Sequence, residues 1–127
     1  MLYTDIELQQ AKDIVETCDT VAPGTKGCYS SRIATWIHFC NTHCSGDDLI
    51  TEQRLADYVE WLASLGAADR ISQGAIRIQQ VIRNQLHGVM CYWRIQNGGR
   101  TDVSDPRQGP IFTEKWKQVA RCHPHSY

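Results

Sequence analysis

Apolar residues recur every three or four positions along most of the chain, which is the spacing of one face of an α-helix. The longest such pattern falls in one narrow sector of a helical wheel and consists of Ala75, Ile78, Ile82, Leu86, Val89 and Trp93. The pattern predicts helices at about residues 4–18, 28–43, 51–65, 72–97 and 113–121 and no strand. The expected fold is therefore all-α, a four- to five-helix bundle that residues 1–127 form as a single domain.

Residues with strong preferences for helix ends set the expected boundaries. Thr4 is the expected N-cap of the first helix, with Glu7 in its first turn, and Thr51 is the expected N-cap of the third. The dipeptide Pro23-Gly24 breaks the pattern, so we expect the second helix to begin after it. Gly88 interrupts the longest helix and is expected to cost up to about 1 kcal/mol relative to alanine.

Charges are distributed unevenly, although the net charge is only −1. Residues 1–65 hold ten acidic and four basic side chains, whereas residues 66–100 hold one acid and five arginines. A basic segment in an otherwise acidic chain is a candidate surface for nucleic acid. The sequence shows no signal peptide and no apolar run long enough to span a membrane. We therefore expect a protein that is not secreted, and that is nuclear if eukaryotic and otherwise cytoplasmic.

One face of the helix predicted at 72–97 carries side chains that suit DNA. At about 100° per residue, a sector of roughly 80° contains the polar residues Arg70, Gln73, Arg77, Gln80 and Asn84. Arg, Gln and Asn make two-point contacts with guanine and adenine edges in the major groove. No carboxylate occurs between Arg70 and Arg100, and Arg83 flanks the face within reach of backbone phosphates. The alternative interpretation is an ordinary solvated helix face.

Three segments resemble the core-binding domain of tyrosine recombinases. They are Tyr29-Ser-Ser-Arg-Ile-Ala-Thr-Trp-Ile-His-Phe-Cys40, Thr51-Glu-Gln-Arg-Leu-Ala-Asp-Tyr-Val-Glu-Trp-Leu62, and Leu65-Gly66 through Arg70-Ile-Ser-Gln-Gly-Ala-Ile76. The first has the family's early aromatic residue, central Trp and aromatic-Cys pair, and the last is similar to its turn into a long DNA-contacting helix. The resemblance covers roughly residues 29–86, about half of the chain, and its cysteine- and tryptophan-rich character looks like the eukaryotic Crypton-type lineage.

The resemblance implies a SAM-like bundle whose second and fourth helices lie against duplex DNA. Carried over to matching positions, it implies contacts from Lys26, Ser31 and Arg32 on the second helix, and from Gln73, Arg77 and Gln80 on the fourth, with Arg70 just before it. Together with the helical-wheel analysis, the expected DNA-binding residues are Lys26, Ser31, Arg32, Arg70, Gln73, Arg77, Gln80, Arg83 and Asn84. Among these, Gln73, Arg77 and Gln80 are expected to read bases, and Lys26, Arg70 and Arg83 to hold phosphates.

The catalytic residues of the recombinase family are not found in this sequence. That chemistry needs an Arg, a His-x-x-Arg motif, a further His or Trp and a Tyr nucleophile, and here no arginine follows a histidine at the third position. Tyr127 is the last residue. We therefore expect a non-catalytic DNA-binding domain whose partner is double-stranded DNA, with no cofactor, no small-molecule substrate and no membrane.

Two other features of the sequence suit different functions. The acidic first half and an apolar last helix that includes Trp116 would also suit a helical module for protein interaction or self-association. Separately, Cys40, His43 and Cys44 are spaced so that one helix face offers three zinc ligands. We prefer reduced thiols in the core and on the surface, because Cys40 belongs to an apolar stripe. No metal site is therefore predicted.

Overall fold

The computed structural model describes residues 3–18, 22–68, 70–98, 100 and 102–122, without the side chains of 23, 66–68, 70–77 and 122. The described residues form helices and no strand, which confirms the all-α prediction. In chain order the elements are α1 (Asp5–Glu16), α2 (Pro23–His43), α3 (Glu52–Ala68), α4 (Arg70–Gln96), the 3₁₀ turn η1 (Pro106–Gln108) and α5 (Pro110–Cys122). None of the described helices is both long and apolar enough to cross a membrane.

The chain divides into two compact units. Unit 1 comprises residues 1–49 and 85–100, and unit 2 comprises residues 50–84 and 101–127. Helix α4 therefore contributes its residues up to Asn84 to unit 2 and its residues from Gln85 onward to unit 1.

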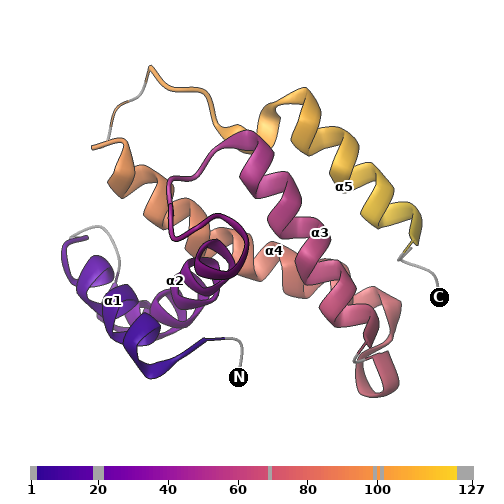
Figure 1. The fold of residues 1–127 in the computed structure, drawn as a ribbon, viewed down its shortest axis with the longest axis horizontal. Helices are drawn as coiled ribbons and strands as arrows, with labels where there is room; N and C mark the ends of the chain where they lie inside the picture. Colours follow the sequence, from indigo (N-terminus) through magenta and orange to yellow (C-terminus); the bar gives the residue numbers. More distant parts are fainter. Residues whose placement is uncertain (1–2, 19–21, 69, 99, 101, 123–127) are drawn as a thin grey trace. The chain divides into compact units, whose positions relative to one another are not determined.

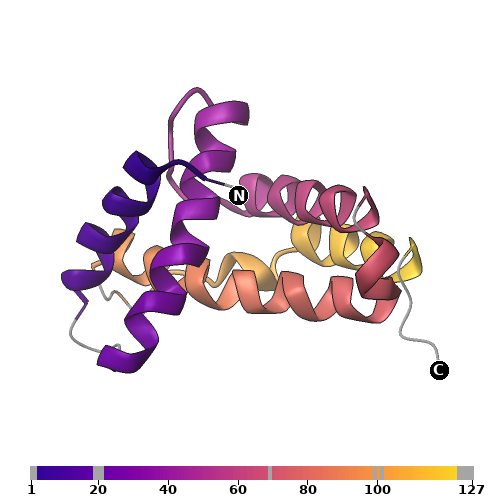
Figure 2. The same ribbon diagram turned by 90° about the horizontal axis from the view of Figure 1, so that it is seen from below.

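In unit 1, α1 lies along α2 (Figures 1 and 2). Ala11 and Val15 bury the inner face of α1, and Ile33 and Trp36 are fully buried on α2. The expected N-cap is confirmed, because the Thr4 hydroxyl accepts a hydrogen bond from the Glu7 amide. Apolar burial of this kind contributes roughly 25 cal/mol per Å², so it helps to hold α1 in place.

The loop between α2 and α3 is fixed by its two aspartates. The Asp48 carbonyl oxygen accepts hydrogen bonds from Trp36 Nε1 at 3.0 Å and from Gln96 Nε2 at 2.9 Å. Its carboxylate accepts a hydrogen bond from the Tyr92 hydroxyl. Burial, together with this bond to Asp48, raises the pKa of Tyr92 to about 12. Asp47 accepts from the Leu49 amide at 3.2 Å, so both carboxylates have structural roles in the loop.

Helices α2 and α4 approach closely at one glycine. A Cβ atom added to Gly88 would lie 2.5 Å from Cβ of Arg32. Contacts that short do not occur between real Cβ atoms, so only glycine fits this crossing. Gly88 is therefore required for packing in unit 1. From the sequence alone it was expected only to weaken the helix.

In unit 2, α3 and α5 lie side by side and run in the same direction (Figures 1 and 2). Thr51 caps α3 as expected, because its hydroxyl accepts from the Arg54 amide at 3.2 Å. The Glu52 carboxylate, in the first turn of α3, accepts from the Ile111 amide at 2.6 Å and the Phe112 amide at 3.1 Å. It thus lies at the N-termini of two parallel helices, where the helix dipoles favour negative charge.

Four helices extend beyond their expected bounds, and α4 begins at Arg70, two residues before the expected start, so that Arg70 belongs to the helix. Helix α2 begins at Pro23, five residues before the expected start, and α5 begins at Pro110 instead of Thr113. Proline is well suited to the first position of a helix, because its φ is already helical and the amide it lacks would be unpaired there. Helix α3 continues past Gly66 to Ala68.

Candidate functional site

The nine residues expected to bind DNA fall on two helices. Lys26, Ser31 and Arg32 lie on α2 in unit 1, and the other six lie on the part of α4 that belongs to unit 2. The side chains of Arg70, Gln73 and Arg77 lie outside the described residues.

Two of the α2 residues are engaged by α1 or by the segment just before it. Lys26 Nζ lies 3.6 Å from Glu16 Oε2, and the Ser31 hydroxyl forms a 3.0 Å hydrogen bond with the Tyr3 hydroxyl. The Glu16 side chain is 72% exposed, so its pairing with Lys26 is screened by solvent and weak. Lys26 can therefore exchange this partner for another anion at little cost, whereas Ser31 is held by a part-buried bond.

Arg32 has a packing role. Its aliphatic stem fills the crossing at Gly88, and its guanidinium carbon lies 5.8 Å from the centroid of the Tyr29 ring. Long basic side chains commonly bury the stem and leave the charged end accessible. A role for Arg32 in DNA binding would therefore use only the end of its side chain.

The polar side of α2 is covered by α1 around a buried carboxylate. Glu7 is 5% exposed and accepts hydrogen bonds from the Thr4 amide at 2.7 Å and from Asn41 Nδ2 at 2.8 Å. His38 Nδ1 lies 3.0 Å from the same carboxylate. Burial on its own would raise the pKa of Glu7, but the hydrogen bonds from Thr4, Asn41 and His38 and the electrostatic attraction of His38 lower it below its usual value. This part of α2 therefore serves to dock α1.

The described part of the α4 face is open and polar. Gln80 and Arg83 are exposed, and Asn84 is half-buried. Gln80 Nε2 donates to Asn84 Oδ1 at 3.0 Å, which leaves Gln80 its carbonyl oxygen and its second N–H. A donor and an acceptor on one amide are what an adenine edge requires.

Arg83 is held by a residue that the sequence analysis did not include in the site. Its guanidinium carbon lies 5.3 Å from the centroid of the Trp116 ring on α5. No carboxylate of the described residues forms an ion pair with Arg83. The two residues before Trp116 on α5 pair elsewhere, Glu114 with Arg121 and Lys115 with Glu60. From the sequence, Trp116 is expected only as part of an apolar last helix, and the 32 residues between it and Arg83 offer no local signal of the contact.

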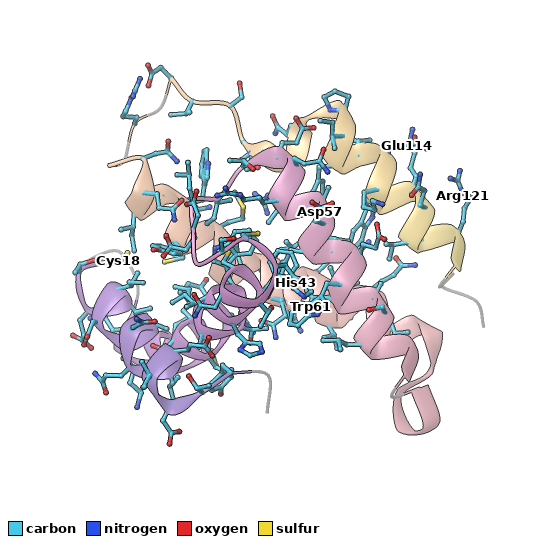
Figure 3. The ribbon with its side chains drawn as sticks, viewed as in Figure 1. Cys18, His43, Asp57, Trp61, Glu114 and Arg121 are labelled. Carbon is cyan, nitrogen blue, oxygen red and sulfur yellow. The ribbon has the colours of Figure 1, made fainter. Side chains whose placement is uncertain are left out.

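The cysteines are dispersed among several environments. Cys40 is fully buried, His43 is exposed, and no three His, Cys, Asp or Glu side chains of the described part of the chain are arranged to hold a metal ion. Cys91 is buried near Cys18, at the end of α1 (Figure 3). Burial, and a hydrogen bond with the Cys18 thiol, raise the pKa of Cys91 to about 11, so it stays a neutral thiol at physiological pH.

Of the described side chains of the expected site, Gln80 and Arg83 on α4 are exposed, whereas Ser31 and the stem of Arg32 on α2 are engaged within unit 1. Comparison of the chain with protein-family models, curated proteins and solved structures found no match.

Proposed function

We propose that this protein binds double-stranded DNA, without catalysis, through the outer face of α4. The observation that carries the proposal is the exposed Gln80 and Arg83 on a helix of 27 residues that contains four arginines and no carboxylate. A surface helix without function more often mixes Glu and Lys for helix propensity and ion pairing. Because one carboxylate on this face would repel phosphates, its absence favours an anionic partner.

The dimensions of α4 are compatible with this role. Residues 70–84 rise about 21 Å at 1.5 Å per residue. The major groove, about 12 Å wide, admits a single helix and displays a distinct pattern of donors and acceptors for each base pair. In this proposal Gln73, Arg77 and Gln80 read bases, and Arg70 and Arg83 hold phosphates.

We further propose that the chain is built like the SAM-like core-binding bundle of tyrosine recombinases. The all-helical fold and the single long helix after α3 support the resemblance. The α2 contacts that the resemblance implies are reduced here, because Ser31 hydrogen-bonds to Tyr3 and the stem of Arg32 packs at Gly88. The proposed interface is accordingly the part of α4 that belongs to unit 2.

A binding experiment with the whole chain tests the proposal. The anisotropy of a labelled duplex of random sequence is followed at about 50 mM salt and again up to about 200 mM, and affinity is expected to fall steeply as condensed counterions are released. Arg83→Gln is expected to weaken binding. Arg121→Gln removes the same charge from an exposed, ion-paired position and serves as the matched control. The proposal fails if a folded sample shows no binding at the lower salt concentration.

The alternative function is a helical module that binds protein, and one observation favours it. Large apolar side chains stand exposed in each unit: Ile6 and Leu49 in unit 1, and Val81 and Ile111 in unit 2. Sedimentation over a concentration series, with and without duplex, separates the two functions. Self-association that duplex leaves unchanged favours the protein module, whereas a complex that forms only with duplex favours DNA binding.

A further inference from the structure

The contact between Arg83 and Trp116 uses none of the arginine's hydrogen-bond donors. A guanidinium over the face of an indole ring is attracted by the negative face of the ring. All five N–H donors therefore remain for another ligand, and they have the fork geometry that matches two phosphate oxygens. No described carboxylate occupies them.

The indole ring itself is held by the packing of α5. Trp116 is half-buried and lies nearly parallel to Phe112, at an interplanar angle of 10° and a centroid distance of 6.5 Å. Phe112 is 6% exposed, and its amide donates to Glu52 on α3. The ring that faces Arg83 is thus connected to α3 through a buried side chain and a backbone hydrogen bond.

Further along α5, a second contact with α3 restricts the turn that carries Trp116. Lys115, which precedes Trp116 in the sequence, forms an ion pair with Glu60 on α3. Glu114 and Arg121 lie on the side of α5 turned away from α3 (Figure 3) and pair with each other at 3.8 Å. The acid nearest to Trp116 on its own helix is therefore occupied by a cation of that helix.

We propose that Trp116 is a positioning residue, which holds the Arg83 guanidinium so that its donors meet a backbone phosphate of duplex DNA. This inference rests on the proposed function and adds α5 to it. A free arginine side chain loses rotamer freedom when it binds, and an arginine already held over a ring loses less. Helix α5 thereby contributes to DNA affinity although its tryptophan does not touch DNA.

A double-mutant cycle in the whole chain tests this coupling. Losing one phosphate contact removes about 0.9 from the slope of log affinity against log salt, so Arg83→Gln should cost roughly 15-fold at about 50 mM salt and about fourfold at about 200 mM. Trp116→Leu should cause part of the same loss with the same change of slope. In the R83Q background, Trp116→Leu should change neither affinity nor slope. Trp116→Phe keeps a ring face and should retain most of the affinity.

The outcomes separate this inference from the function on which it rests. Equal losses from Trp116→Leu with and without Arg83 would indicate a merely structural role and overturn it. No loss from Trp116→Leu, or none from Arg83→Gln, also overturns it while DNA binding by the unaltered chain stands. Absence of binding by the unaltered chain removes the proposed function and this inference together. Circular dichroism checks folding, and Trp116→Met fills the site without a ring should Trp116→Leu unfold.

Discussion

Each unit contains a glutamate that ties one helix to another, and the two ties differ in chemistry. Glu7 joins α1 to α2 in unit 1, where it is 5% exposed and bonded to the side chains of His38 and Asn41. Glu52 joins α3 to α5 in unit 2, where it is partly exposed and accepts two backbone amides. The first tie depends on particular side chains in the partner helix, whereas the second requires only that a helix begins there.

The two ties therefore constrain evolution and stability differently. Substitutions at His38 or Asn41 would weaken the first tie directly. The second tie uses only backbone amides of α5, so it would survive side-chain substitutions there that leave those amides in place. Protonation of a buried carboxylate should also weaken its hydrogen bonds strongly, whereas water screens the charge of a partly exposed capping carboxylate, so that its protonation matters less.

Glu7→Ala should have the largest effect on stability. It removes a buried acceptor of several hydrogen bonds, and we expect a loss of about 2–3 kcal/mol in the free energy of unfolding. Urea denaturation followed by circular dichroism measures it. Glu16→Ala removes an exposed carboxylate of the same helix and should cost less than about 0.5 kcal/mol. Similar losses for the two variants would mean that the buried Glu7 carboxylate contributes no more to stability than the exposed Glu16 carboxylate.

Gly88→Ala is the next largest change, and its expected sign opposes helix propensity. Propensity alone predicts a gain of up to about 1 kcal/mol. The clash with Cβ of Arg32 instead predicts a net loss of about 1–3 kcal/mol, because the stem of a side chain cannot swing away. In Gly109→Ala the new Cβ would displace the Glu52 carboxylate from the Ile111 and Phe112 amides, so its cost should be close to the loss of that cap, about 1 kcal/mol. The melting temperatures of both variants measure these costs, and a stabilised Gly88→Ala protein would refute the close crossing.

Glu52→Ala should cost about 1 kcal/mol, as is typical of losing a helix-capping side chain. Glu52→Gln keeps an acceptor oxygen but loses the charge, so the difference between the two variants isolates the contribution of the helix dipoles. Hydrogen exchange of the Ile111 and Phe112 amides reports the loss locally. Unchanged protection of those amides in Glu52→Ala would mean that Glu52 does not hold α5.

Acid should weaken the first tie, with a smaller effect than deleting it. The pKa of folded Glu7 is lowered, so its contribution to stability is complete above the unfolded-state pKa. That contribution is lost as the pH falls through the folded pKa. The free energy of unfolding should therefore decrease below about pH 4.5, and Glu7→Gln should flatten the decrease. An identical acid profile in that variant would assign the effect to other carboxylates.

The helices were predictable because their signals are local. Apolar spacing and the caps Thr4 and Thr51 need only a few neighbouring residues, and both caps are confirmed. The expected start of α2 at residue 28 is wrong, because Pro23 occupies the first position of the helix, where a proline begins a helix and does not break it. Proline occurs both where helices end and at their first position, so the residue type alone does not decide which of the two applies.

The site was less predictable, because its decisive contacts join distant residues. Thr35 and His38 lie opposite the apolar stripe of α2 in the sequence, yet Thr35 is 2% exposed and His38 meets Glu7. A helical wheel cannot show that α1 covers that side. Likewise, nothing near Arg83 in the sequence indicates Trp116, and nothing near Glu52 indicates Phe112. The polar face of α4 is recognisable from its composition alone, whereas the residues that orient it are not.

The thiol of Cys91 gives the chain a built-in reporter of local opening. Because it is buried and its pKa is raised to about 11, it should react with an alkylating reagent at neutral pH only while unit 1 is transiently open. Cys28 is exposed on α2 and should react at once, which calibrates the reagent in the same sample. The labelling rate of Cys91, site by site in a mass spectrum, would then follow the breathing of unit 1 separately from the cooperative unfolding of the whole chain.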